Sequence, residues 1–290
     1  MNAQRIIWLA SFPKSGNTWL RSFLAQYFMP QGKAPDINAL REFTTGDVRI
    51  DFFERAAGRK PFVAADFDEW LKVRQKALHL IATSKPSHHF VKTHCRIDRI
   101  GPYFLIPPEV TAAALYLIRN PFDVAQSYSR HLSFGLDDTI ARMLDPAGMN
   151  HTTANIFEVT GRWDGHIQSW TEAQGLAVHV MRYEDMIADT EKTFRALLGF
   201  LRAPVQDGKL RRAIRATSFD TLKREEATKG FIERPKGMEA FFAKGKVGSW
   251  REALSPDQVG RLREGFGPTI ERYWPEMLAE VDAIAGRAGA

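Results

Sequence analysis

Arg5-Ile-Ile-Trp-Leu-Ala-Ser-Phe-Pro-Lys-Ser-Gly-Asn-Thr-Trp-Leu-Arg-Ser-Phe-Leu-Ala-Gln-Tyr-Phe28 is the stretch of sequence that decides the fold. Residues 6–10 form a short apolar run rich in β-branched and aromatic residues, which predicts a buried strand. Pro13 and Gly16 interrupt the run, and apolar residues return at helical spacing over residues 19–28. A strand, a glycine-containing loop and a helix in this order are typical of a phosphate-binding unit, because loop N–H groups and a helix N-terminus attract an anion.

Three further apolar segments and three helical patterns interleave along the chain. The predicted strands are residues 89–93, 113–118 and 177–181, and the predicted helices are residues 121–131, 167–171 and 190–201. Strands that alternate with helices favour a parallel sheet covered by helices. The expected fold class is α/β: a single domain over residues 1–290 with a central parallel β-sheet flanked by helices, similar to P-loop nucleotide-binding proteins.

In two stretches the apolar residues show no clear helical or strand periodicity. Residues 30–75 mix Gly, Pro and Asp with aromatic residues, and we expect short helices and loops there. Residues 229–246 are rich in Gly, Lys and Phe, which favours a mobile loop or lid. A last helix is expected from Ser255-Pro-Asp257, where an N-cap residue precedes proline.

The composition narrows the class of protein. Of the 290 residues, 44% are hydrophobic, so the chain has enough apolar surface to fold. The single cysteine excludes an internal disulfide and a zinc site with several thiolates. No membrane span or signal peptide is recognisable, so a cytoplasmic location is expected. The net charge of +6 suits an anionic ligand, but no basic stripe with interleaved aromatics suggests nucleic acid.

The loop after the first strand carries Lys14 and Thr18. In nucleotide triphosphatases the lysine follows the last glycine and precedes Ser or Thr, whereas Lys14 precedes Gly16. A phosphate-like anion other than a Mg²⁺-bound triphosphate is therefore favoured. The alternative is an ordinary turn with an exposed lysine.

Two other strand ends carry reactive side chains. His94 follows the second strand in Lys92-Thr-His94, where it could abstract a proton from a hydroxyl while Lys92 stabilises oxygens. The alternative is a histidine bonded to a backbone carbonyl. Arg119 ends the third strand and Ser127 lies two turns into the next helix, a spacing that can place both on one phosphate. The alternative there is an Arg119–Asp123 pair that caps the helix.

Together these motifs resemble the cytosolic-type sulfotransferase family, which uses 3′-phosphoadenosine 5′-phosphosulfate (PAPS) as donor. The resemblance runs from Ser11 to about Trp250. The matching segments are Ser11-Phe-Pro-Lys-Ser-Gly-Asn-Thr-Trp19, Phe90-Val-Lys-Thr-His94, Tyr116-Leu-Ile-Arg-Asn-Pro-Phe-Asp-Val-Ala-Gln-Ser127, Arg182-Tyr-Glu-Asp-Met186, Thr217-Ser-Phe219 and Ala243-Lys-Gly245. The short start is similar to bacterial members that tailor natural products, including glycopeptide antibiotics.

The resemblance implies in-line transfer of the sulfuryl group of PAPS, without a metal, to a hydroxyl or amine of a small-molecule acceptor. It implies His94 as the base, Lys14 as the group that neutralises the bridging oxygen, and Lys92 as the group that stabilises the sulfuryl oxygens. The donor-binding residues that it implies are Lys14, Ser15, Gly16, Asn17, Thr18, Trp19, Arg119, Ser127, Tyr183, Thr217, Phe219, Lys244 and Gly245.

The sequence departs from the family pattern in four places. Ala243 stands where an arginine that contacts the 3′-phosphate is usual, and the family's dimerisation motif does not follow Trp250. The usual N-terminal extension is absent, and the loop that usually gates the acceptor pocket is not recognisably similar. Other functions that share a phosphate loop are an ATP-dependent small-molecule kinase and a non-catalytic nucleotide-binding module. A kinase would show a Lys-Ser or Lys-Thr pair after the glycine and an acidic metal ligand, and neither is found in that form.

The acceptor is expected to be apolar or aromatic. Residues 30–75, 131–160 and 229–245 are the expected walls of its pocket, and five phenylalanines within them suggest the apolar character: Phe52, Phe53, Phe231, Phe241 and Phe242. An aromatic-rich segment is as often packed into the core, and that alternative stays open. No nucleic-acid or membrane partner is expected.

Overall fold

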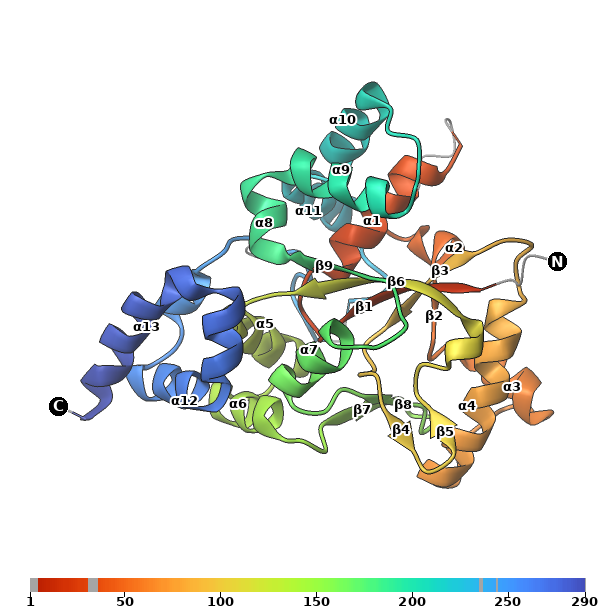
Figure 1. The fold of residues 1–290 in the computed structure, drawn as a ribbon, viewed down its shortest axis with the longest axis horizontal. Helices are drawn as coiled ribbons and strands as arrows, with labels where there is room; N and C mark the ends of the chain where they lie inside the picture. The colour runs from red at the N-terminus through yellow and green to blue at the C-terminus, as the bar shows by residue number, and fades with distance from the viewer. Residues whose placement is uncertain (1–4, 31–35, 235–236, 244, 290) are drawn as a thin grey trace.

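A computed structural model describes residues 5–30, 36–234, 237–243 and 245–289. Its centre is a parallel sheet in the order β2-β3-β1-β6-β9 (Figure 1). These strands are β2 (Thr45–Gly46), β3 (His89–Thr93), β1 (Ile6–Ser11), β6 (Thr111–Ile118) and β9 (Val178–Arg182). The four longer strands confirm the predicted ones, and the parallel register between neighbours confirms the expected sheet type.

Alternation along the strands divides the core between the two faces of the sheet. On one face Leu9, Leu115 and Leu117 pack against four helices, which lie together above the sheet in Figure 1. These helices are α1 (Asn17–Phe28), α8 (Tyr183–Ala188), α9 (Thr190–Phe200) and α10 (Asp207–Ala216). The strand residues next to Leu9, Leu115 and Leu117 point to the opposite face of the sheet, because successive side chains of a strand alternate in direction.

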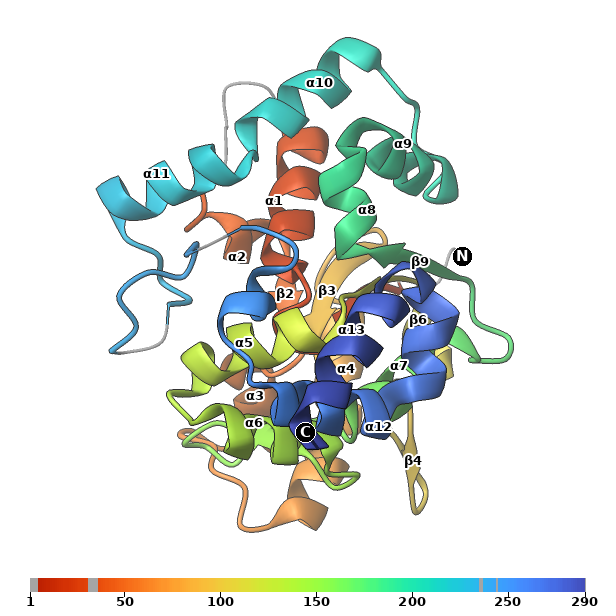
Figure 2. The ribbon, with the colours of Figure 1, turned by 90° about the vertical axis from the view of Figure 1, so that its left-hand side faces the viewer.

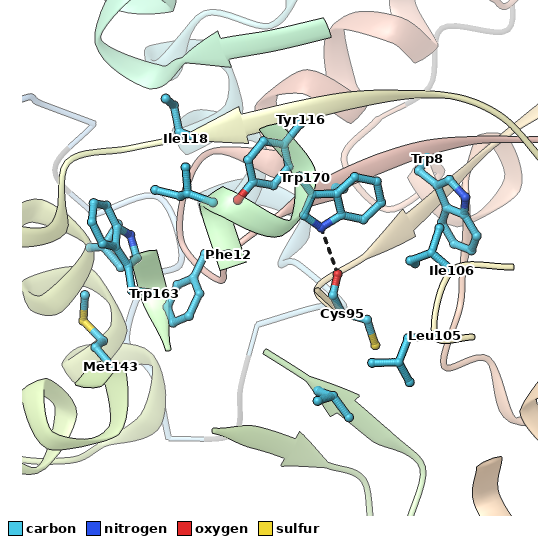
Figure 3. Close-up of a cluster of buried hydrophobic side chains, with 14 of the residues drawn as sticks. Trp8, Phe12, Cys95, Leu105, Ile106, Tyr116, Ile118, Met143, Trp163 and Trp170 are labelled. Atoms are coloured by element: carbon cyan, nitrogen blue, oxygen red, sulfur yellow. Dashed lines mark hydrogen bonds between the residues drawn. The ribbon is translucent and has the colours of Figure 1, made fainter. Parts of the chain in front are cut away.

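The opposite face carries the larger part of the core. Trp8, Tyr116 and Ile118 pack there in one hydrophobic cluster with Trp163 and Trp170 of helix α7 (Figure 3). The helices of this layer are α3 (Ile50–Ala57), α4 (Phe67–Ala82), α5 (Pro121–Leu132), α6 (Leu136–Leu144), α7 (Trp163–Thr171), α12 (Pro256–Tyr273) and α13 (Leu278–Ala285). The second view shows both helical layers from the side (Figure 2).

Short elements complete the fold. Two antiparallel hairpins, β4 (Arg99–Ile100) with β5 (Tyr103–Phe104) and β7 (Met149–His151) with β8 (Phe157–Val159), lie outside the main sheet. Helix α2 (Leu40–Phe43) precedes β2, and α11 (Phe219–Lys229) follows α10. Within the described ranges, no helix is both long enough and apolar enough to cross a membrane.

The largest difference from the sequence-based expectation is at residues 30–82. They contain α3, the strand β2 and the 16-residue helix α4, where only short helices and loops were expected up to residue 75. The side chain of Asp66 caps α4 by accepting a hydrogen bond from the N–H of Glu69 at 2.8 Å. Strand β2 is too short for an alternating pattern to show, because it has two residues.

Candidate active site

Four neighbouring strands end at one edge of the sheet, where parallel strands usually place their functional groups. The residues next after β3, β6 and β9 are His94, Arg119 and Tyr183, and β1 leads into the loop that carries Lys14. All four side chains line one cavity of about 1600 Å³. Because a single drug-sized ligand fills about 300–1000 Å³, this cavity has room for two ligands.

The loop after β1 has the backbone shape of an anion cradle. Lys14 has φ +70° and Gly16 has φ +104°, so both adopt the left-handed conformation. A Cβ on Gly16 would lie 2.7 Å from the Tyr183 ring, and only glycine fits there. The amide of Asn17 donates to the carbonyl of Leu9 at 2.9 Å, which fastens the start of α1 to β1.

Three buried polar atoms of this loop and of the first turn of α1 have no hydrogen-bond partner among the described residues. They are the hydroxyl of Ser15, the amide oxygen of Asn17 and the indole nitrogen of Trp19. Uncompensated buried polar atoms are costly, so they fit a site that is completed by a polar ligand. Thr18 also lines the cavity, and the Trp19 ring contacts the Tyr183 ring edge to face at 6.0 Å.

The ring of His94 is held in one orientation. Its Nδ1 lies 2.7 Å from the carbonyl oxygen of Ser11, and since a carbonyl only accepts, Nδ1 carries the hydrogen. Nε2 is thereby left as a basic nitrogen, and within the described part of the chain no hydrogen bond engages it. Burial first, and the charge of Lys92 second, hold the pKa of His94 well below its ordinary value. The imidazole is therefore neutral at pH 7.

Helix α7 fixes the backbone around His94 from behind. His166 Nε2 lies 3.2 Å from the carbonyl oxygen of His94, and the Tyr116 hydroxyl lies 2.7 Å from His166 Nδ1. One residue further, the indole of Trp170 donates to the carbonyl of Cys95 at 3.1 Å (Figure 3). These bonds leave little freedom for the backbone of His94.

Lys92 lies in β3, Lys14 lies in the loop after the neighbouring strand β1, and both line the cavity. Burial lowers the pKa of Lys14 to about 7, and the nearby charges of Lys92, Arg119 and Arg130 add to this shift. The Lys14 ammonium lies 4.2 Å from the centre of the Phe241 ring. Four cations that crowd one cavity destabilise each other until an anion enters, which favours a ligand with several negative charges.

Arg119 connects the loop to α5. It donates to the carbonyl of Lys14 at 3.2 Å, and its guanidinium stacks 4.4 Å above the Tyr183 ring. It also lies 3.8 Å from Asp123, so the pairing considered from sequence is present as well. The cap of α5 is instead Asn120, which accepts from the N–H of Asp123 at 2.9 Å. Ser127 lines the cavity two turns further along.

The late segment of the chain, which comprises the described residues of 230–249, lines one side of the cavity. Gly245 has φ +58°, and a Cβ there would overlap the ring of Phe219, so both residues pack closely and line the cavity. Asp123 accepts from the N–H of Gly248 at 2.8 Å, which ties the segment to α5. Lys244, implied as a phosphate ligand, lies outside the described residues.

Several residues singled out in the sequence are placed away from the cavity. Thr217 is buried, and its hydroxyl donates to the carbonyl of Ala213 at 2.8 Å. The neighbouring Ser218 lines the cavity, whereas Thr217 does not. Phe52, Phe53 and Phe231 are packed in hydrophobic clusters and do not line it. Phe241 and Phe242 do line it, as do parts of all three stretches expected to form its walls.

Other cavity residues were not singled out in the sequence. Among them are Arg130 and His131 of α5, Arg142 of α6, and Glu158 of β8. Arg130 lies three residues after Ser127 and therefore on the same side of α5. This spacing is the sequence signal that could have identified Arg130 as a cavity residue. Glu158 sits in a hairpin too short for its direction to be predicted. Among the described residues no group of three or more His, Cys, Asp or Glu side chains could hold a metal ion.

The family model described as "Sulfotransferase domain" matches residues 4–274. The chain belongs to the sulfotransferase domain family. Human sulfotransferase 1C2 is 24% identical to this sulfotransferase over 277 residues, covering 91% of this chain and 82% of the relative. Rabbit (Oryctolagus cuniculus) amine sulfotransferase is 22% identical, covering 92% and 81%.

Solved structures show the same fold. Mouse sulfotransferase SULT7A1, solved in complex with PAP, is 20% identical to this sulfotransferase, with a TM-score of 0.61 and coverage of 92% and 85%. Retinol dehydratase, solved with androsterone and the inactive cofactor PAP, is 18% identical, with a TM-score of 0.63 and coverage of 91% and 80%. The expected fold, a parallel sheet flanked by helices, is thus confirmed.

Proposed function

We propose that this member of the family transfers the sulfuryl group of PAPS to a hydroxyl or amine of a small-molecule acceptor. The observation that carries the proposal is the convergence of Lys14, Lys92 and the neutral His94 on one cavity that has room for two ligands. Membership in the sulfotransferase family and the PAP bound to two structural neighbours support the choice of donor.

The residues of the cavity fit a doubly phosphorylated nucleotide. The cradle of residues 14–19 suits the 5′-phosphosulfate, because it offers a positive-φ loop, a helix N-terminus and unpartnered polar atoms. Arg119 and Ser127 suit the 3′-phosphate, and Trp19, Tyr183 and Phe219 suit the adenine. Gly245 allows the late segment to approach closely. Lys244 and Thr217 stay predictions from the resemblance.

Arg130 supplies the phosphate contact that the sequence lacks at Ala243. Its guanidinium lines the cavity, and in the described part of the chain it makes no hydrogen bond or ion pair. Burial lowers its pKa, and the charge of Arg119 adds to the shift, which places the two cations near each other. Two neighbouring guanidinium groups, of which Arg130 has no acidic partner among the described residues, suit a phosphate.

The roles of the three reactive residues follow from their environment. Bound PAPS supplies the sulfuryl group, which leaves its bridging oxygen on PAP as the new bond to the acceptor forms. His94 Nε2 accepts the proton of the acceptor, because Nδ1 is already bonded to Ser11. Lys14 places positive charge at the loop that holds the departing phosphate, and Lys92 places it beside His94.

The acceptor side of the cavity supports a partly apolar acceptor. Apolar side chains of three separate segments line it: Val48, Ile50, Leu132, Phe134 and Ile156. Two of the five phenylalanines on which the expectation rested, Phe241 and Phe242, also line the cavity. A cytoplasmic location stays a prediction.

Calorimetry tests this function directly. PAP, ADP and ATP are titrated into the protein without metal, and we expect PAP to bind more tightly than both. Turnover is then followed with PAPS and a phenolic acceptor. Equal or tighter binding of ATP, with a further gain on adding Mg²⁺, would contradict the proposal and favour a kinase.

A further inference from the structure

Glu158 is a carboxylate on the wall of the cavity. Its neighbours along β8 point away from the cavity: Val159 is 4% exposed, and Phe157 packs against Trp70 with ring centres 5.4 Å apart. Because successive side chains of a strand point to opposite faces, Glu158 points the other way, and it lines the cavity.

The position of β8 places Glu158 at the end of the cavity that holds the base. The carbonyl of Val159 accepts the N–H of Arg96 at 2.8 Å, so β8 is bonded to the segment that directly follows His94. The positive charge of Lys92 also acts to lower the pKa of Glu158. Glu158 is therefore on the acceptor side, beside the residues proposed to act on the acceptor.

Glu158 differs from its cross-strand neighbour in having no partner. Asn150 lies opposite it in the hairpin, and the Asn150 side-chain oxygen accepts from the Tyr128 hydroxyl at 2.9 Å and from Arg142 at 2.8 Å. The Glu158 carboxylate makes no hydrogen bond and no ion pair with any residue that the structure describes. The carboxylate oxygens of Glu158 are therefore available to accept hydrogen bonds from a ligand.

The charged groups around Glu158 do not provide a partner either. Arg74 is bound to Asp47 at 2.7 Å, and the guanidinium of Arg142 is bound to the Asn150 side chain at 2.8 Å. Lys92 contacts the sulfuryl group under the proposed function. Burial raises the pKa of Glu158; Lys92 opposes the shift, Asp47 adds to it and Arg74 opposes it. A ligand that brings a positive charge would remove this cost of burial, whereas an anionic ligand would add to it.

We propose that Glu158 recognises a cationic group, such as a primary ammonium, on an acceptor whose hydroxyl is presented to His94. The inference rests on the proposed function, because it assumes that this end of the cavity holds the acceptor. The apolar lining on the same side suits a ring or short chain between the two polar ends.

Three phenols that differ in one substituent separate the possibilities. Tyramine, 4-ethylphenol and 3-(4-hydroxyphenyl)propionate carry a cationic, a neutral and an anionic chain on the same ring. Each is titrated by calorimetry into the protein saturated with PAP, so that no turnover is needed. The variants are Glu158→Gln, which keeps the shape of the side chain, and Glu264→Gln, which removes an exposed carboxylate outside the cavity.

We expect wild-type protein to bind tyramine more tightly than 4-ethylphenol, and the propionate least. Glu158→Gln should weaken tyramine binding by about 10- to 100-fold, the range for a lost bond to a charged group. It should leave 4-ethylphenol nearly unchanged, and Glu264→Gln should change neither. With PAPS, kcat/KM should follow the same order, and the melting temperature reports whether Glu158→Gln is folded.

Two results would overturn the inference. One is a wild-type protein that does not prefer tyramine to 4-ethylphenol. The other is a Glu158→Gln variant that weakens both phenols equally, which would mean that the residue acts through Lys92 or the fold. A failure of PAP to bind would instead overturn the proposed function. The comparison of the phenols can then be run without nucleotide, and it still decides the role of Glu158.

Discussion

The imidazole of His94, at the end of β3, donates through Nδ1 to the carbonyl oxygen of Ser11, at the end of β1, over 2.7 Å. The two strands are neighbours in the sheet, with Ala10 paired to Thr93, so the bond joins His94 to the start of the loop that carries Lys14. One hydrogen bond thus sets both the tautomer of His94, the proposed base, and its position relative to the loop proposed to hold the 5′-phosphosulfate.

His94→Ala should remove most turnover and leave PAP affinity within a few-fold of wild type. Loss of a general base costs about 10²–10⁴-fold in rate. Since burial holds the pKa of His94 well below 6.5, the base is already deprotonated at pH 6.5, and wild-type kcat should not fall between pH 8 and pH 6.5 on its account. Steady-state kinetics over this range checks both points, and activity that survived within a few-fold would contradict the assignment.

Binding of PAP should weaken as the pH rises from 7 to 9. Free Lys14 has a pKa of about 7, so it is cationic below pH 7 and neutral above it. A bound polyanion favours the charged form, so binding above pH 7 must take up a proton, and affinity should fall by up to about tenfold per pH unit. Calorimetry at pH 8.5 in two buffers of different ionisation enthalpy measures the proton uptake.

Lys14→Met should abolish this dependence, whereas Lys223→Met, at an exposed lysine outside the cavity, should retain it. The histidine His131, which also lines the cavity, has a pKa lowered by burial to about 4 and does not titrate in this range. An unchanged proton uptake in Lys14→Met would show that another group is responsible.

Gly16→Ala should weaken PAP binding by more than about tenfold. Its φ is +104°, and the new Cβ would lie 2.7 Å from the Tyr183 ring, which must then move. Gly58→Ala is the matched control: Gly58 also has a positive φ, at +68°, but nothing lies within 4 Å of the added atom. Both should lose about 1 kcal/mol or more of stability to backbone strain, and only Gly16→Ala should lose affinity.

The first strand, loop and helix could be predicted because each left a strong local pattern in residues 5–28. Parallel neighbours end at the same edge, so the sequence could also predict that His94 and the Lys14 loop lie near each other once their strands are adjacent. Glu158 could not be assigned this way, because its direction depends on a three-residue strand that is too short to leave a periodic signal. Arg130 could have been placed on the side of α5 that carries Ser127, because the two residues are three positions apart in a helix.

The phenylalanines show the opposite problem. The sequence predicts Phe52 and Phe53 as walls of the acceptor pocket, but α3 turns them into the core, where they are 4% and 0% exposed. An apolar residue gives the same sequence signal whether it lines a pocket or fills a core. The two cases differ only in what packs against the residue from distant parts of the chain.

Arg130→Ala and Arg119→Ala should each reduce the preference for PAP over ADP. ADP lacks the 3′-phosphate, so loss of a guanidinium that holds this group should cost PAP about 10- to 100-fold and leave ADP nearly unchanged. Arg212→Ala, at an exposed arginine that does not line the cavity, is the control. If Arg130→Ala weakened PAP and ADP alike, its charge would act on the whole nucleotide, and the contact missing at Ala243 would lie elsewhere.

Glu233 should fasten the late segment over the cavity in a pH-dependent way. Its carboxylate accepts two bonds of 2.8 Å from Arg21 of α1, and both side chains are largely buried. Burial acts to raise the pKa of Glu233, but the bonds and charge of Arg21 outweigh it and hold the pKa at about 2. The stabilisation is therefore present above pH 4.5, the ordinary value, and is lost as the pH falls from 4.5 to 2.

Glu233→Gln should reduce the free energy of unfolding by about 3 kcal/mol at pH 7, the order given by a pKa lowered from 4.5 to about 2. Urea unfolding at pH 7, 5 and 3.5 should show the same deficit at the first two values and a smaller one at the third. Glu264→Gln should show no deficit at any of them. Because Glu233 and Phe241 line the cavity, PAP affinity should fall with the loss of this attachment. A variant equally destabilised at pH 7 and 3.5 would mean that the bonds matter for packing and that their charge contributes little.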